Sequence, residues 1–330
     1  MNLSRMTVAV LVDEEVVVSE ALPRLRTGQI ERFVHDALKR QAKRVELRPF
    51  TTVDAVLQWL RRYKPDVVFN LTEHAQGDRH GDARVCAVLE LHGIPYTGAG
   101  PRGLMLCRDK AVSKLIAERE GFRVPRFFTV DSQAPAIPES VAFPIIVKPR
   151  SSDSSDGISQ RSLVHSRAEL LRRIRIAGKT SRDVICEEFI DGREMVVGVA
   201  CDRVMRAREF LVGVDSPRAP RIASTRFKHD AAYRRRWKIK MDFAKLTRAQ
   251  TESLRTLALK TASALDMRDY GRIDLRLTPN SEWVFLEANP NPALAPFEHT
   301  LSGSWYGVDF DELVADITLA AYNRKPCNAL

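Results

Sequence analysis

A hairpin near the C-terminus constrains this chain more than any other segment. Two runs of strand-forming residues, 272–277 and 283–289, are separated by a short polar break. Antiparallel pairing about residues 280 and 281 places Leu277 opposite Val284, Asp274 opposite Glu287, and Arg272 opposite Asn289. Because side chains alternate along strands, one face is predicted to be wholly apolar. Its members are Ile273, Leu275, Leu277, Val284, Leu286 and Ala288.

The opposite face of the hairpin is polar and carries Arg272, Asp274, Glu287 and Asn289. Two carboxylates directly opposite each other repel, so we expect a cation between them, and we expect neutralisation of one carboxylate to stabilise the metal-free protein. Carboxylate and amide oxygens are ligands that Mg²⁺ prefers, usually together with substrate phosphates. The hairpin therefore predicts a floor for phosphate and magnesium. The alternative is a solvated strand face with ordinary surface charges.

Length and composition indicate a soluble globular protein of two or three domains, with 330 residues of which 44% are apolar. No run approaches the roughly 20 apolar residues of a membrane span, and the early run from Val8 to Val12 reads as a first buried strand. The five cysteines show neither a CxxC spacing nor a disulfide framework. We therefore expect a cytoplasmic protein with no membrane partner.

The net charge of +10 favours anionic ligands. Its densest cluster, residues 234–240, invites a nucleic-acid interpretation. The cluster is single, and solvated arginine-rich loops are common on basic proteins. We expect no nucleic-acid partner.

The order of predicted elements indicates an α/β domain followed by α+β structure. Strands at 7–12, 44–49 and 66–70 alternate with helices at 29–40, 53–62 and 82–92, which predicts a parallel sheet covered by helices on both faces. Residues 94–101 form a turn-rich boundary. Beyond it we expect helices at 109–120 and 167–174, and strands at 143–147, 184–189 and 195–200.

A lysine and a loop of small residues follow the strand at 143–147. Lys148 is fixed by the following proline, and residues 151–157 are hydroxyl-rich with nothing apolar to pack. Such a loop can cover a triphosphate with its N–H groups, although a plain linker has the same composition. Gly178-Lys179-Thr180 is not a Walker A site, because Arg173 stands where its first glycine must be.

Seven motifs together resemble the D-alanine–D-alanine ligases of the ATP-grasp superfamily. They are residues 95–100 (PYTGAG), 109–110 (DK), 146–149 (IVKP), 154–155 (SS), 187–194 (EEFIDGRE), 271–274 (GRID) and 286–289 (LEAN). The resemblance covers most of the chain. It implies an ATP-grasp fold in three parts: an N-terminal α/β domain, residues 1–100; a central subdomain, 101–190, with a lid loop at 151–157; and a C-terminal subdomain, 191–330, with the magnesium site.

The resemblance also implies roles for individual residues. Lys110 and Lys148 match phosphate-binding lysines, and Glu187 matches the acid that receives the adenine amino group. Glu188 and Ile190 match backbone positions along the adenine edge, and Glu194 matches the acid that binds the ribose hydroxyls. The remaining matches are Ser154 and Ser155 in the lid, Lys228 on a loop over the terminal phosphate, Arg272 beside the acyl phosphate, and Asp274, Glu287 and Asn289 on magnesium.

The implied activity is ATP-dependent amide or peptide bond formation through an acyl phosphate, with release of ADP and phosphate. The cofactors would be ATP and Mg²⁺, with Mn²⁺ as a substitute. The substrates would be a small carboxylate and a small amine, and the resemblance also implies a homodimer.

Substrate recognition departs from the family pattern. Glu15 matches the glutamate that holds the first amino group, but a surface acid is an equal interpretation. Of the family's next motif, this sequence retains His74 or His80 and Asp82. Ala293 replaces a glycine that forms part of the family's oxyanion hole. Glu298-His299 stands where the family has a Ser-Leu carboxylate clamp.

We therefore expect a ligase that joins other amino acids or a related amine. Two alternatives remain: an authentic D-alanine–D-alanine ligase of peptidoglycan precursor synthesis, and a nucleotide-binding regulator of reduced activity. Intact Lys148, Arg272, Asp274, Glu287 and Asn289 argue against the regulator.

Overall fold

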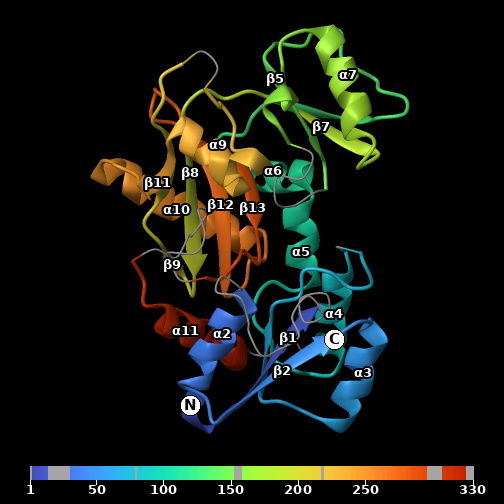
Figure 1. Cartoon of the computed structure of the whole chain (residues 1–330), viewed down its shortest axis with the longest axis vertical. Helices are drawn as coiled ribbons and strands as arrows, with labels where there is room; N and C mark the ends of the chain where they lie inside the picture. The colour runs from blue at the N-terminus through green and yellow to red at the C-terminus, as the bar shows by residue number, and fades with distance from the viewer. Residues whose placement is uncertain are drawn as a thin grey trace.

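The computed structural model describes residues 2–13, 30–78, 80–151, 158–216, 219–295 and 307–324. Its elements form three separate sheets (Figure 1). The parallel sheet lies at the bottom of that view, the four-stranded sheet at the top and the six-stranded sheet between them. None of the helices in the described ranges is long and apolar enough to span a bilayer. The described cysteines, 86, 107, 186 and 201, are free thiols.

The first sheet is parallel and has the order β2-β1-β3, formed by β1 (Thr7–Asp13), β2 (Arg44–Phe50) and β3 (Val67–Asn70). The central strand β1 is almost entirely apolar because helices cover both of its faces. One face packs on α2 (Ile30–Lys39) and α11 (Phe310–Asn323), and the other on α3 (Val53–Arg62) and α4 (Gly81–Leu91). The predicted α/β character of this region is confirmed.

The second sheet is antiparallel with the order β4-β7-β5-β6. Its strands are β4 (Phe127–Asp131), β5 (Ile145–Pro149), β6 (Leu163–Val164) and β7 (Asp183–Glu188). Helix α7 (Arg167–Ala177) covers one face through Leu170 and Ile174, and Gly178 is its C-cap. This sheet delivers Lys148 and Glu187 to the site.

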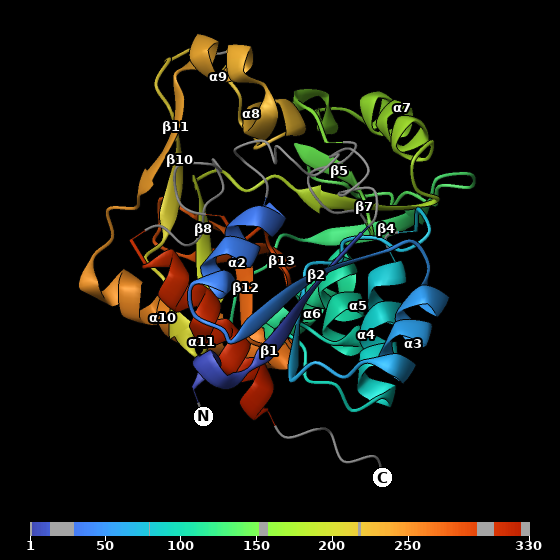
Figure 2. The same cartoon turned by 60° about the horizontal axis from the view of Figure 1, so that its bottom comes forward.

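The third sheet has six strands, five of them in the order β11-β10-β8-β12-β13. They are β8 (Arg193–Ala200), β9 (Arg203–Val204, on β8), β10 (Arg208–Val212), β11 (Ile239–Phe243), β12 (Tyr270–Leu277) and β13 (Trp283–Asn289). Its core face packs on α10 (Arg248–Ala264) and α6 (Lys110–Arg119). Two short helices, α8 (Thr225–His229) and α9 (Ala231–Trp237), follow β10 (Figure 2).

The predicted domain boundaries at residues 100 and 190 remain a proposal. Helix α5 (Pro101–Arg108) begins at Pro101, inside the turn-rich segment that was predicted as a boundary. Helices α5 and α6 both contact β13 of the six-stranded sheet, and α11 returns to the parallel sheet. The chain therefore crosses between the three sheets at several points.

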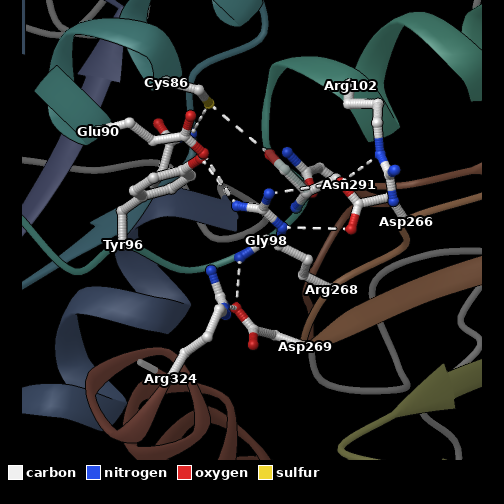
Figure 3. A network of polar contacts seen from close by, with 12 residues as sticks. Cys86, Glu90, Tyr96, Gly98, Arg102, Asp266, Arg268, Asp269, Asn291 and Arg324 are labelled. Atoms are coloured by element: carbon white, nitrogen blue, oxygen red, sulfur yellow. Dashed lines mark hydrogen bonds and ion pairs between the residues drawn. The ribbon is translucent and has the colours of Figure 1, made fainter. Parts of the chain in front are cut away.

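A polar network joins residues 90–99, next to the parallel sheet, to residues 268–291 (Figure 3). Arg268 donates to Glu90 at 3.0 Å, and the Tyr96 hydroxyl donates to the same carboxylate oxygen at 2.6 Å. Two backbone groups of the first region are also held from across the interface: Gly98 N donates to Asp269 at 2.8 Å, and Ala99 N donates to Asn291 at 2.9 Å. We call this set of contacts the polar network.

Candidate functional site

A pocket lies between the four-stranded and six-stranded sheets and gathers most of the residues that the resemblance selected. Its wall includes Lys148, Glu187, Glu188, Ile190, Glu194, Lys228, Asp274 and Glu287. Apolar side chains complete it, among them Ile146 of β5, Leu286 of β13 and Ile222 from the segment between β10 and α8. The pocket therefore offers a row of charged groups beside an apolar slot.

A buried ion cluster holds Lys148 in place. Glu187 is 1% exposed, and its two carboxylate oxygens lie 2.9 Å from Lys148 Nζ and 2.8 Å from Lys114 Nζ. Burial opposes ionisation of Glu187, but the two lysines outweigh it and lower the pKa of the carboxyl group. Lys114 also donates to the Leu286 carbonyl at 2.6 Å, which connects α6, β7 and β13.

Lys110 is positioned by the start of its helix. Asp109 is the N-cap of α6 and accepts the Ala111 and Val112 N–H groups. The same carboxylate forms a two-pronged ion pair with Arg150, and the Arg150 carbonyl accepts the Lys110 N–H at 3.2 Å. The segment after Lys148 is therefore fastened to the helix that carries Lys110.

The hairpin register is confirmed at its functional end. Arg272 pairs with Asn289, and Asp274 pairs with Glu287. Beyond Asp274 the predicted register is wrong, because a β-bulge places one extra residue, Leu286, in β13.

The bulge changes the predicted apolar face. Trp283 and Phe285 lie in the core with Ile273, Leu275, Leu277 and Ala288. Leu286, which was predicted to face the core, lines the pocket instead. Val284 pairs with Arg276 of β12 and not with Leu277, its predicted partner. An extra residue in one strand reverses the alternation, and neither hydrophobicity nor turn composition signals where it occurs.

Positive side chains surround the two facing carboxylates. Arg272 donates to Asp274 at 2.5 and 3.2 Å, and Lys228 Nζ lies 3.9 Å from the same carboxylate. Burial alone would raise the pKa of Glu287, but four cations outweigh it and lower the pKa from 4.5 to about 2. Those cations are Lys110, Lys228, Lys148 and Arg272. For Glu287 this direction argues against the expectation that neutralising a carboxylate stabilises the protein, since attraction to these cations opposes the mutual repulsion.

The donor set of the floor fits a hard divalent cation. Asp274 and Glu287 face each other and Asn289 lies two residues further along β13, so two carboxylates and an amide are available on one face. The Asn289 side-chain nitrogen is buried and has no hydrogen-bond partner within the described ranges. A buried N–H donor of this kind costs free energy unless an acceptor such as a phosphate oxygen reaches it, and only the oxygen of the same amide could bind a cation.

Comparison with known proteins assigns the family. The family model for the D-ala D-ala ligase C-terminus matches residues 120–318. The D-alanine–D-alanine ligase of Azoarcus sp. is 31% identical over 294 residues, and the alignment covers 85% of this chain and 88% of the relative. The chain belongs to the D-alanine–D-alanine ligase family. It is an ATP-grasp ligase that forms carbon–nitrogen bonds.

Two further similarities add to this assignment. The uncharacterised protein y4sG of Sinorhizobium fredii is 33% identical over 260 residues, which cover 78% of this chain and 75% of y4sG. The crystal structure of the Bacillus anthracis D-alanine–D-alanine ligase complexed with ATP superposes with a TM-score of 0.67 at 16% sequence identity. That alignment covers 96% of both chains and shows that the ATP-grasp fold is shared.

Several residues predicted for this ligase lie outside the described ranges. They are Glu15, the lid residues Ser154 and Ser155, and the pair Glu298 and His299. Their assigned roles stay predictions, as does the lid itself.

His74 and Asp82, which the resemblance selected, both form ion pairs in the structure. His74 Nδ1 lies 3.5 Å from Asp13, which also accepts the Glu73 and His74 N–H groups. Asp82 forms a buried ion pair with Arg108 at 2.6 Å.

The sequence analysis missed Arg276, which lines the pocket, and Lys114, which is buried behind it against Glu187. The sequence around Lys114 does not mark it as a buried residue, because a lysine on an amphipathic helix is normally solvated. Its position four residues after Lys110, on the same helix face, is the one feature that indicates the site. Arg276 could have been found. It follows Arg272 and Asp274 at the two-residue period of a strand, so all three share one face.

Proposed function

We propose that this ligase uses ATP to activate a small carboxylate substrate as an acyl phosphate, and joins it to a small amine with release of ADP and phosphate. The main support is the pocket between the two sheets, where Lys110, Lys148, Lys228 and Arg272 converge on Glu287. A cluster of cations above hard-oxygen ligands suits a polyphosphate and its metal. The ATP bound to the Bacillus anthracis ligase of the same fold adds support.

The residues proposed to bind the nucleotide fall into two groups, one for the phosphates and one for the adenine and ribose. Lys110 and Lys148 would bind the phosphates, while Ile190 and Glu188 would meet the adenine edge with their backbone groups. Glu194 would accept the ribose hydroxyls. Glu187 would receive the adenine amino group through the lone pairs that its two lysines leave available.

Asp274, Glu287 and Asn289 would hold Mg²⁺, or Mn²⁺ in its place. When bound, the metal would neutralise charge on the transferred phosphoryl group. Arg272 and Lys228 already lie against Asp274 and would add positive charge beside the reacting oxygens. Ser154 and Ser155 would close over the phosphates, and Glu15 would hold the amino group of the first substrate.

We further propose that D-alanine is not the second substrate. A carboxylate brought beside Glu298 would meet repulsion instead of a hydroxyl donor, and about 1.4 kcal/mol of lost binding means tenfold weaker acceptance. An amine, an amide or a larger acceptor avoids that cost. The alternative is an authentic D-alanine–D-alanine ligase with unusual loops.

The test is phosphate release with Mg-ATP over a panel of amino acids, dipeptides and amines. We expect turnover that requires one carboxylate and one amine, with D-alanine a poor acceptor. Efficient D-alanyl-D-alanine formation, with a KM for the acceptor in the ordinary range below about 1 mM, would restore the alternative. ATP binding without phosphate release on any pair would favour a nucleotide-binding regulator.

A further inference from the structure

Arg276 is a buried arginine in the wall of the proposed nucleotide pocket. It is 4% exposed and lies on β12, two residues beyond Asp274 on the same face. In the register of β12 with β8 it stands directly opposite Glu194. The strand that carries the metal floor therefore also reaches the carboxylate proposed for the ribose.

The Arg276 guanidinium joins three separate segments. One terminal nitrogen donates to the Ile190 carbonyl. The other donates to Glu194 Oε2 at 2.5 Å and to the Arg221 carbonyl at 2.6 Å. Its plane also lies over the Phe189 ring, 4.9 Å from the centroid. A lysine has one ammonium group and cannot present this forked set of donors.

The segment that contains Arg221 covers the pocket. Ile222 and Ala223 line the pocket directly. Gln160, just before β6 of the four-stranded sheet, accepts the Arg221 N–H at 3.0 Å and donates to the Ile222 carbonyl at 2.7 Å. Arg276 and Gln160 together therefore hold residues 221–223 in place as one wall of the pocket.

We propose that Arg276 is a positioning residue for the nucleotide: it orients Glu194 toward the ribose hydroxyls and holds residues 221–223 against the base and sugar. The inference rests on the proposed binding of ATP and adds the group that sets selectivity for ribose. One oxygen of Glu194 is engaged by Arg276, which fixes the carboxylate plane and leaves the other oxygen for a hydroxyl donor. Preorganisation of this kind increases affinity because the partner need not be ordered on binding.

The chain offers a matched control in Arg193, on the neighbouring strand of the same sheet. Arg193 forms a two-pronged ion pair with Glu209 at 2.5 and 2.9 Å and donates to the Lys245 carbonyl at 3.1 Å. It thus makes the same kinds of contact as Arg276, a carboxylate and a backbone carbonyl, but it does not line the nucleotide pocket.

The experiment compares equilibrium binding of Mg-ADP, Mg-2′-deoxyADP and Mg-3′-deoxyADP to the full chain by calorimetry. The wild type should prefer ADP to the deoxynucleotides by about tenfold, the usual value of a hydrogen bond to a charged group. In Arg276→Gln the Kd for ADP should rise about tenfold to a hundredfold, and most of the preference for ribose should disappear. Arg193→Gln should leave both quantities at the wild-type values. Arg276→Lys retains the charge beside Glu194 and should lie between.

The outcomes separate this inference from the proposed function. If the wild type binds none of the nucleotides, the proposed function fails and the inference fails with it. If the wild type binds ADP without preferring it to the deoxynucleotides, or if folded Arg276→Gln retains the full preference, the inference alone is overturned. Should Arg276→Gln fail to fold, Arg276→Lys decides, and wild-type affinity and preference in that variant would overturn the role of the guanidinium fork.

Discussion

Glu287 illustrates how neighbouring residues decide the chemistry of a single side chain. The sequence places it opposite another acid, which suggests repulsion. In the folded chain four cations surround it and keep it ionised. Since these cations come from α6, β5, β12 and α8, only folding brings them to the hairpin.

The first prediction concerns Glu287→Gln. We expect phosphate release to fall at least a hundredfold and the Mg²⁺ concentration for half-maximal activity to rise, because the floor loses a charged ligand. The free energy of unfolding should fall by about 3 kcal/mol, since four nearby cations lose one of the carboxylates that offset their charge. Glu282→Gln is the control: Glu282 is half exposed on the same hairpin, beside Arg123. Near-wild-type turnover in Glu287→Gln would remove the residue from the site.

The second prediction concerns pH. The pKa of Glu287 is depressed in the folded state, so its stabilising contribution is complete above about pH 4.5 and is lost as the pH falls toward about 2. The difference in unfolding free energy between the wild type and Glu287→Gln should therefore be constant above pH 5 and shrink below pH 4.5. Chemical denaturation at several pH values measures it. A difference that does not change down to about pH 2 would contradict the assignment.

At the level of elements, the site depends on how two sheets and a helix are joined. The bulge in β13 turns Leu286 toward the pocket and frees its carbonyl from the β12 ladder. Lys114 from α6 donates to that carbonyl and pairs with Glu187 of β7. One buried ammonium group thus links the pocket-lining strands of both sheets.

The third prediction is that Lys114→Met destabilises the protein by about 3 kcal/mol, because the Leu286 carbonyl loses its donor and Glu187 loses one of two counter-ions. Methionine has a similar length, so packing is largely retained. Lys260→Met on the exposed face of α10 is the control and should change stability by about 0.5 kcal/mol or less. Urea denaturation provides the comparison. Equal free energies of unfolding in the two variants would show that Lys114 does not stabilise the fold.

At the scale of the whole molecule, the polar network joins the first region to the sheet that carries Asp274 and Glu287. Asn291 lies two residues after Asn289 and accepts the Ala99 N–H, so the loop beyond the floor is fastened to the first region. Gly98 has a φ of 87°, and an added Cβ would lie 2.5 Å from the Asn291 side chain, so a side chain is excluded there on both grounds.

The fourth prediction compares two arginines that share a partner. Arg268 and Arg102 both pair with Asp266, but Arg268 is 21% exposed and also binds Glu90, while Arg102 is 70% exposed. Arg268→Gln should lower the free energy of unfolding by about 2–4 kcal/mol, and Arg102→Gln by about 0.5 kcal/mol, since exposed ion pairs are screened by water. Thermal unfolding of both variants measures this. Equal effects would show that the network does not join the regions.

The seven motifs indicated the ATP-grasp fold only through their resemblance to a known family. The sequence by itself determined the α/β character of the first region and the pairing of the hairpin from Arg272 to Asp274. These depend on local information: the period of apolar residues, turn composition, and alternation along a strand, all of which can be read from neighbours in the chain. The pairing of Asp274 with Glu287 is of this kind. So is the delivery of Lys148 by an apolar strand.

The tertiary structure decided what those residues touch. The bulge at Leu286 depends on how β13 packs between Lys114 and the core, and the ion pair of Arg276 with Glu194 depends on β8 lying beside β12 across about 80 residues of chain. The electrostatics of Glu287 likewise depend on cations from four elements. Coulomb interactions and burial act through space, so the charge state of a site belongs to the assembled fold, whereas periodicity belongs to the chain.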